Sequence, residues 1–289
     1  MMEDYSFTDY FLKEKKSKSA FKLFAKFMYA LLIFYAILLT VSFLFHKEYR
    51  YITIQGPSMQ PTLNPDPIYV DGVEHQDGVY IKLNNSEEDL ADIDYGDIVI
   101  VDRSEERGEE GYTVIKRVIG FEGDKLSIVK LPVGENGEYE MRVLRIKEGT
   151  GVIECLEEDY VKSYEEWGQY TVLYDEIEYD DMFFYHIMFA NQTEIYPYYI
   201  DGQRFDVHFF TIGSDKMPSE PDQIFIMGDN RINSQDSRET GTSDVDKIVG
   251  KVVRIVHNSY SLRNSLFGWL ENIYDFLSII WEEIVNLFR

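Results

Sequence analysis

The sequence of 289 residues carries 52 Asp and Glu against 28 Lys and Arg, which gives a formal net charge of −24. This excess of negative charge disfavours contact with nucleic-acid phosphates, so we expect no nucleic-acid partner. The single cysteine, Cys155, excludes an intramolecular disulfide, and the five histidines lack the spacing of a metal site. We therefore expect one main domain with no metal and no other cofactor.

The N-terminal region contains a long apolar segment. Residues 27–45 carry no charge, and a helix needs about 20 apolar residues to cross a hydrocarbon core. Six lysines precede the segment, while Lys47 and Arg50 follow it, so the positive-inside rule places residues 1–26 in the cytoplasm. We predict a single-pass helix over residues 27–46 in the cell membrane, with the rest of the chain outside the cytoplasm. The alternatives are a buried core helix and a cleaved secretory signal, although a cleaved signal would be shorter and end at small residues.

Beyond this segment the pattern changes to short runs of β-forming residues, separated by Gly, Asp and Asn. It predicts a mainly β domain over residues 47–258. Its expected strands are Tyr51–Ile54, Ile98–Val101, Thr113–Ile119, Lys125–Val129, Gln223–Met227 and Lys251–Val256. Residues 74–94 and about 134–221 are acidic, rich in Tyr and weakly periodic, so we expect them to be insertions into the β core without chemistry of their own.

The C-terminal region, residues 259–289, shows helical periodicity. From Ser265 to Arg289 apolar residues recur at helical spacing with acidic residues between them, which predicts an amphipathic helix. The acidic residues are too frequent for a second membrane span. The helix would either pack on its own domain or lie on the membrane surface, where the scarcity of Lys and Arg is unfavourable.

A serine lies between turn-forming residues shortly after the apolar segment. Ser58 belongs to the run GPSMQPTL, which would hold its hydroxyl on a constrained loop. This run alone is a weak indication of catalysis, because most serines in Pro-rich loops only bond their own backbone. Ser58 lies 13 residues after Phe45. An extended chain of that length reaches at most about 43–47 Å, which places the loop close to the predicted membrane surface.

A lysine lies inside one of the expected strands. In the run YTVIKRVI, strand alternation places Lys116 on one face with Val114 and Val118. Loss of hydration there disfavours the charged ammonium and lowers its pKa from about 10.4 towards neutrality. A neutral lysine can take a proton from serine, as Ser–Lys pairs do without histidine. The alternative is an edge-strand lysine that discourages aggregation.

A third run, over residues 228–238, is too dense in polar side chains for a plain turn and suggests a hydrogen-bonded support. With it the chain resembles bacterial-type signal peptidase I, the membrane protease that removes signal peptides from exported proteins. The family's motifs occur in order as Ser58-Met59-x-Pro61-Thr62-Leu63, Gly96-Asp97-Ile98-Val99, Lys116-Arg117-Val118-Ile119-Gly120, and Gly228-Asp229-Asn230-Arg231 through Asp236-Ser237-Arg238.

The resemblance implies a role for each matching residue. Ser58 would be the nucleophile, and Lys116 the general base and then the general acid. Ser234 would supply the hydroxyl that orients the lysine amine, while Asp236 and Arg238 would brace the site. A lysine partner resembles the bacterial enzyme more than its endoplasmic-reticulum relative.

The resemblance also implies that Gly56 and Met59 lie on the side of the site that binds the substrate and the oxyanion. The family's oxyanion hole uses the nucleophile's own amide, often with a serine hydroxyl two residues earlier. Here that position is Gly56, so the second donor stays open. A missing donor can cost about 10²–10³ in rate.

The implied fold is a largely antiparallel β catalytic domain with an extended groove, in which the signal peptide of a preprotein binds as an added strand. Cleavage would follow small residues at −1 and −3, and the partners would be preprotein signal peptides and the lipid bilayer.

Two rival functions differ in what they require. A self-cleaving repressor with the same Ser–Lys pair would be soluble and attached to a DNA-binding module. The apolar segment and the net charge of −24 argue against this function. A catalytically silent, membrane-tethered interaction protein would use the acidic insertion as its binding surface, but it would not need Ser58, Lys116 and Ser234 together.

Overall fold

The computed structural model divides the chain into two compact units, Met1–Glu48 and Tyr49–Arg289. The structure describes residues 7–64, 68–70, 73–133, 138–161, 174–179, 182–187, 193–200, 202–213, 221–257, 277–279, 281 and 285.

The first unit contains one helix, α1 (Phe7–Glu48), of 42 residues. The helix includes most of the lysine-rich segment predicted for the cytoplasm as well as the apolar segment after it. Among the described residues, no helix meets the combined length and hydropathy that a membrane crossing needs. The transmembrane helix over residues 27–46 stays a prediction.

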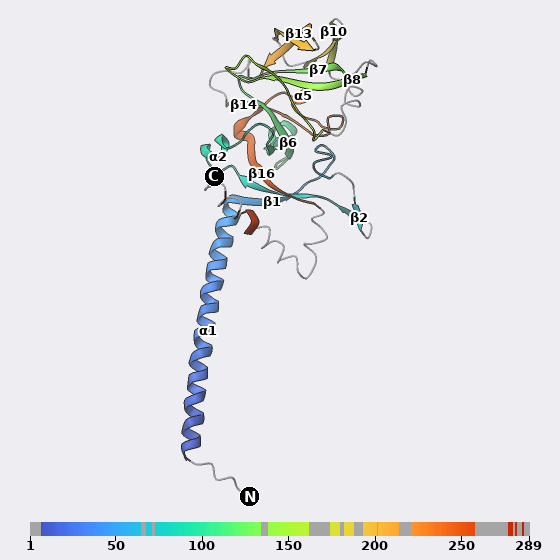
Figure 1. Cartoon of the computed structure of the whole chain (residues 1–289). Helices are drawn as coiled ribbons and strands as arrows, with labels where there is room; N and C mark the ends of the chain where they lie inside the picture. The colour runs from blue at the N-terminus through green and yellow to red at the C-terminus, as the bar shows by residue number, and fades with distance from the viewer. Residues whose placement is uncertain are drawn as a thin grey trace. The chain divides into compact units, whose positions relative to one another are not determined.

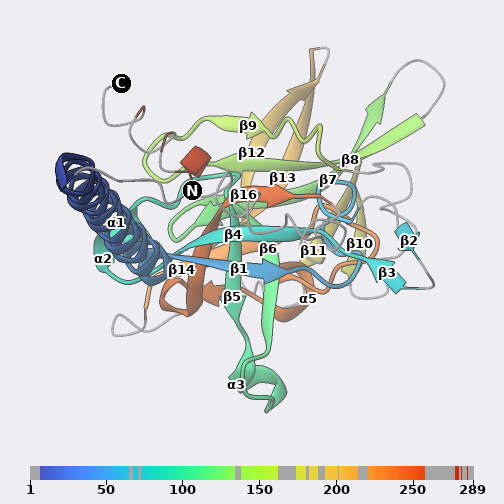
Figure 2. The same cartoon turned by 90° about the horizontal axis from the view of Figure 1, so that it is seen from below.

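The second unit is mainly β, as predicted, and every strand pair in its sheets is antiparallel. Its first sheet has seven strands in the order β1-β4-β16-β5-β6-β14-β15. Figure 2 labels β1, β4, β5, β6, β14 and β16 of this sheet. All six expected strands are confirmed, five in this sheet and one, β7, in the second. The strands of the first sheet are β1 (Tyr49–Thr53), β4 (Gly78–Leu83), β5 (Ile98–Asp102), β6 (Thr113–Phe121), β14 (Gln223–Met227), β15 (Ser243–Asp244) and β16 (Ile248–Val256).

The prediction that residues 74–94 form an insertion was wrong. They contain β4, which pairs with β1 on one side and β16 on the other and is therefore an internal strand of the first sheet. The residues of β4 from Gly78 to Ile81 are all buried. A strand covered on both faces has no alternation of polar and apolar residues, which is why its pattern appeared weakly periodic.

The second sheet is built mostly from the segment predicted as the larger insertion. Its strands are β7 (Lys125–Val133), β8 (Glu138–Ile146), β9 (Ile153–Cys155), β10 (Tyr174–Tyr179), β11 (Met182–Ile187), β12 (Thr193–Ile200) and β13 (Gln203–Thr211). Figure 1 shows β7, β8, β10 and β13 gathered at one end of the β domain. A two-stranded ribbon, β2 (Ile68–Val70) with β3 (Val73–His75), follows the Ser58 loop.

Buried apolar clusters cover both faces of the first sheet and join it to the second. Along β5, Ile98 and Ile100 belong to one cluster and Val99 and Val101 to another. A third cluster contains residues of β6 and β14 together with residues of β7, β8 and β13. This shared core fixes the second sheet against the strands that carry Lys116 and the 228–238 loop.

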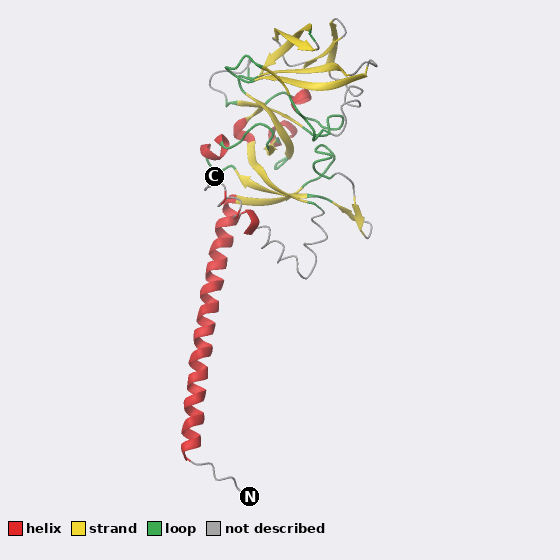
Figure 3. Cartoon of the chain, viewed as in Figure 1, coloured by secondary structure: helices red, strands yellow, loops and turns green. Residues whose placement is uncertain are grey.

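Helices are short in the β domain, where strands and loops dominate (Figure 3). Among the described residues from 49 to 257 they are α2 (Glu87–Ala91), α3 (Ser104–Arg107), α5 (Ser237–Thr240) and the 3-10 turn η2 (Val245–Lys247). Most of the predicted C-terminal amphipathic helix lies outside the described residues. Of its described part, residues 277–279 are helical, Ile279 is buried, and Ser278 accepts a hydrogen bond from Arg254 on β16.

Candidate active site

Ser58 lies in a loop held from two directions. Its own turn is closed by a hydrogen bond from the Gln60 amide to the Pro57 carbonyl, at 3.0 Å. Asn230 binds the loop from the other side, because its backbone amide donates to the Ser58 carbonyl at 3.0 Å and its side-chain amide to the Pro57 carbonyl at 3.0 Å. The polar 228–238 loop therefore supports the backbone of Ser58, as its composition suggested.

Lys116 extends from β6 to the Ser58 hydroxyl. Its Nζ donates to Ser58 Oγ at 3.0 Å and to the Ile115 carbonyl at 2.9 Å. The lysine is only 3% exposed, which confirms the expectation of a desolvated amine on this strand. The two residues are separated by 58 positions in the sequence, and the packing of the loop on the first sheet brings them together.

The surroundings of Lys116 favour its neutral form. Burial lowers the pKa of Lys116 from 10.5 to about 8, and the positive charges of Arg103 and Arg238 act in the same direction. The carboxylates of Asp236 and Asp229 oppose this shift, with a smaller effect than burial. An amine with such a pKa is partly neutral near pH 7, so it can accept a proton from the serine 3.0 Å away.

Gly228 has no side chain, which allows Ser234 and the backbone of Ser58 to approach it closely. A Cβ atom on this residue would lie 2.2 Å from Ser234 Oγ and 2.4 Å from the Ser58 carbonyl oxygen. The Ser234 hydroxyl and the Ser58 carbonyl thus both lie close to Gly228. The hydroxyl is buried and has no hydrogen-bond partner among the described residues, so its expected bond to the Lys116 amine is not formed here. The orienting role of Ser234 stays a prediction.

Asp236 and Arg238 form a buried pair that fixes the same loop. Arg238 Nε donates to Asp236 Oδ1 at 2.8 Å and its Nη2 to Oδ2 at 2.9 Å, while the Gly228 amide donates to Oδ2 at 2.8 Å. Burial alone would raise the pKa of Asp236, but the charge and hydrogen bonds of Arg238 hold it below its ordinary value. The carboxylate therefore stays ionised and caps the N-terminus of α5.

A family model described as signal peptidase, peptidase S26, matches residues 23–257 of the chain. The chain belongs to this family. The match includes the Ser58 loop, β6 and the 228–238 loop, so the contacts above lie within the matched part of the chain. The chain is a serine peptidase of the signal peptidase type. A comparison with individually curated proteins finds no match.

A second ion pair of this signal peptidase joins two residues that lie within the motifs but to which the sequence assigned no role. Arg117 binds Asp229 through Nε to Oδ1 at 2.8 Å and through Nη2 to Oδ2 at 2.6 Å. The Thr62 hydroxyl donates to Asp229 Oδ2 at 2.5 Å. The pair therefore connects β6, the 228–238 loop and the Ser58 loop. Arg117 and Asp229 are 112 positions apart, so no local pattern could have indicated their contact.

Arg103 is another residue that sequence reasoning missed. It is buried, and its guanidinium donates to the Thr240 hydroxyl at 2.7 Å and the Ser243 hydroxyl at 3.0 Å. Its fixed positive charge lowers the pKa of Lys116. No motif contains Arg103, so only the folded structure could place it near the lysine.

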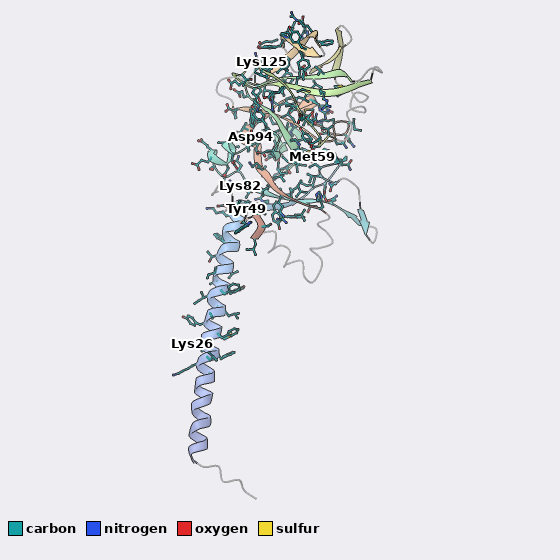
Figure 4. All side chains as sticks on the ribbon, in the orientation of Figure 1. Lys26, Tyr49, Met59, Lys82, Asp94 and Lys125 are labelled. Atoms are coloured by element: carbon teal, nitrogen blue, oxygen red, sulfur yellow. The ribbon has the colours of Figure 1, made fainter. Side chains whose placement is uncertain are left out.

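The two residues assigned to the oxyanion and substrate side lie in different environments. Gly56 is exposed and has a φ of +84°, in the left-handed region that favours glycine. Its carbonyl accepts a hydrogen bond from Asn64 Nδ2 at 3.3 Å. The Met59 side chain is only 1% exposed and packs in the core with Ile54 and Leu63, among the stick side chains of the β domain in Figure 4. Met59 thus anchors the loop to the core, and its contact with substrate stays a prediction.

Proposed function

We propose that this signal peptidase is a membrane-anchored signal peptidase I with Ser58 as nucleophile and Lys116 as general base. The observation that carries the proposal is the 3.0 Å contact between Lys116 Nζ and Ser58 Oγ, made by an amine that is 3% exposed. The order of the chain's motifs and its family membership support the same pair.

In the acylation step, neutral Lys116 takes the proton of the Ser58 hydroxyl while Oγ attacks the scissile carbonyl carbon. The Ser58 backbone amide donates to the developing oxyanion, and a second backbone amide or a water supplies the donor that Gly56 lacks. The lysine ammonium then gives its proton to the departing amine of the mature protein. The signal peptide stays bound to Ser58 as an ester.

In the deacylation step, Lys116 is again neutral and takes a proton from a water molecule that attacks the ester. The ammonium returns this proton to Ser58 Oγ as the ester breaks, which releases the signal peptide with a free carboxylate. Ser234 would orient the amine in both steps, since its buried hydroxyl lies within the same cluster and has no partner among the described residues.

The proposed substrates are exported preproteins, cut after small residues at −1 and −3. Family membership supports this specificity, because signal peptides end in small residues of the A-x-A type. A pocket that fits a methyl group must overpack around an aromatic ring at −1, which typically costs about 1–3 kcal/mol.

The proposed anchor is the apolar part of α1, with residues 1–26 in the cytoplasm and the peptidase domain outside it. Residues 27–45 carry no charge. Phe27, Leu32 and Phe34 are about 60% exposed on the isolated helix, and Figure 4 shows side chains projecting from it beyond Lys26. A helix with apolar residues around its circumference suits a lipid environment. The anchor would confine enzyme and precursor to one surface.

The test uses the full-length protein in detergent with a preprotein that carries Ala at −1 and −3. We expect cleavage after the −1 residue, located by mass spectrometry, and cleavage about 5- to 150-fold slower when Phe replaces Ala at −1. Ser58→Ala should abolish cleavage, whereas Ser86→Ala, a matched change at an exposed serine that caps α2, should leave it unchanged. Equal cleavage by the Ser58→Ala variant would overturn the proposal.

A further inference from the structure

A short segment of the second sheet reaches the polar loop of the site. Residues 156–161, here called the bracing segment, follow β9 directly and lie within the predicted insertion. The Leu156 amide donates to the Val143 carbonyl at 2.9 Å, which ties the start of the segment to β8. Leu156 also packs against the core cluster that contacts Ile232 of the 228–238 loop. The segment therefore begins in one sheet and ends at the catalytic loop carried by the other.

Glu158 in the bracing segment makes a buried ion pair with Arg231 of the 228–238 loop. Arg231 Nη1 donates to Glu158 Oε2 at 3.2 Å, and its Nη2 donates to Oε1. Both side chains are 0% exposed. A guanidinium without a counter-charge would be costly at such a site, so the position of Arg231 depends on the Glu158 carboxylate.

Arg231 in turn holds the backbone on which the site is built. Its Nε donates to the Gly228 carbonyl at 2.9 Å, and its own carbonyl accepts a hydrogen bond from Arg238 at 2.7 Å. Gly228 lies against the Ser58 carbonyl and the Ser234 hydroxyl. A displacement of Arg231 would therefore be transmitted to the residues beside the nucleophile.

Tyr160 connects the bracing segment to the site by a second route. Its hydroxyl donates to Glu158 Oε1 at 3.1 Å, and its ring lies 3.9 Å from the guanidinium carbon of Arg117. Arg117 pairs with Asp229, which accepts the hydrogen bond from Thr62 in the Ser58 loop. One route from the bracing segment thus ends on the 228–238 loop, and the other ends on the loop that carries Ser58.

We propose that the insertion positions the active site, with Glu158 as a positioning residue that fixes the 228–238 loop through Arg231. The inference rests on the proposed Ser58–Lys116 site and gives the insertion a role in catalysis. Buried ion pairs often contribute little to stability compared with apolar residues, so a fixed geometry is a better reason for this one. A misplacement of about 1 Å in a catalytic constellation can cost about 100-fold in rate.

The test compares Glu158→Gln with Glu157→Gln in full-length protein in detergent. Glutamine keeps the size of Glu158 but removes the charge that holds Arg231, while Glu157 is an exposed neighbour. We expect kcat to fall by about 10- to 100-fold in Glu158→Gln, with KM within twofold of the wild type. The thermal transition should stay cooperative but move to a lower temperature, because Arg231 loses its buried counter-charge. Glu157→Gln should retain the wild-type kcat.

A double-variant comparison separates positioning from a loss of folded protein. If Glu158 acts through Arg231, the double variant Glu158→Gln, Arg231→Met should be no slower than Arg231→Met alone. The inference is overturned if Glu158→Gln keeps kcat within twofold of the wild type, or if its activity falls only in proportion to its folded fraction. These outcomes are distinct from activity in Ser58→Ala, which would contradict the proposed function itself.

Discussion

Replacing Lys116 by methionine should stabilise the protein at neutral pH while it removes activity. Methionine keeps an unbranched stem of similar length but carries no charge. Burial lowers the pKa of Lys116 from 10.5 to about 8, so the folded chain holds the ammonium in a site that disfavours it. A difference of about 2.5 pKa units corresponds to about 3 kcal/mol lost from the free energy of unfolding wherever both states are protonated.

The pH dependence of this penalty follows from proton binding. Below pH 8 the lysine is protonated in both states and the penalty is fully present. Between pH 8 and 10.5 the folded chain loses its proton first, so the unfolded chain binds more protons and the stability of the wild type rises with pH. Above pH 10.5 both states are neutral and the penalty is gone. The stabilising effect of Lys116→Met should therefore disappear across this window.

The variant also loses the hydrogen bonds from Nζ to Ser58 Oγ and to the Ile115 carbonyl. Because the Ser58 hydroxyl can bond water instead, we assign about 1 kcal/mol to this loss. The net effect is a gain of about 2 kcal/mol at pH 7, which is about 4–8 °C in Tm for a domain of this size. Above pH 10.5 the sign reverses, and the variant should be less stable by about 1 kcal/mol.

The assay is thermal unfolding of both proteins in detergent at pH 7, 9 and 11, followed by circular dichroism in the β region. Comparing the variant with the wild type at each pH cancels the titration of groups common to both. A Tm of Lys116→Met that is lower than the wild type at pH 7, or a difference that does not change with pH, would refute the claim that burial disfavours the ammonium.

Three further predictions concern the same site. The kcat/KM of the wild type should rise with pH to a midpoint at about 8, as Lys116 loses its proton, and a flat profile from pH 6 to 10 would contradict its role as base. Gly228→Ala should lower kcat by about 10-fold or more, because its Cβ would lie 2.4 Å from the Ser58 carbonyl and 2.2 Å from Ser234 Oγ. Wild-type kinetics in this variant would show that the loop can move away from the added methyl group without loss of activity. Asp236→Asn should lower the free energy of unfolding by about 3–5 kcal/mol at pH 7, because it leaves a buried guanidinium unpaired, and denaturant titration should detect the loss.

Local patterns in the sequence were sufficient for much of the β domain. Strands such as β5, β6 and β14 are short apolar runs between turn residues, and these features are set by neighbouring residues alone. Alternation along β6 also indicated that Lys116 shares its environment with apolar side chains, and its burial confirms this. The motif around Ser58 and the polar 228–238 loop could be located because their residue types are concentrated within a few positions.

The tertiary structure decided what depends on contacts between distant segments. The sequence did not distinguish β4 from an insertion, because a strand buried on both faces has no polar side to reveal its period. Glu154, Glu157 and Glu158 lie within five residues of one another, and no local pattern distinguishes among them. Only Glu158 is buried against Arg231, 73 positions away, because packing of the second sheet on the first carries that one side chain into the site.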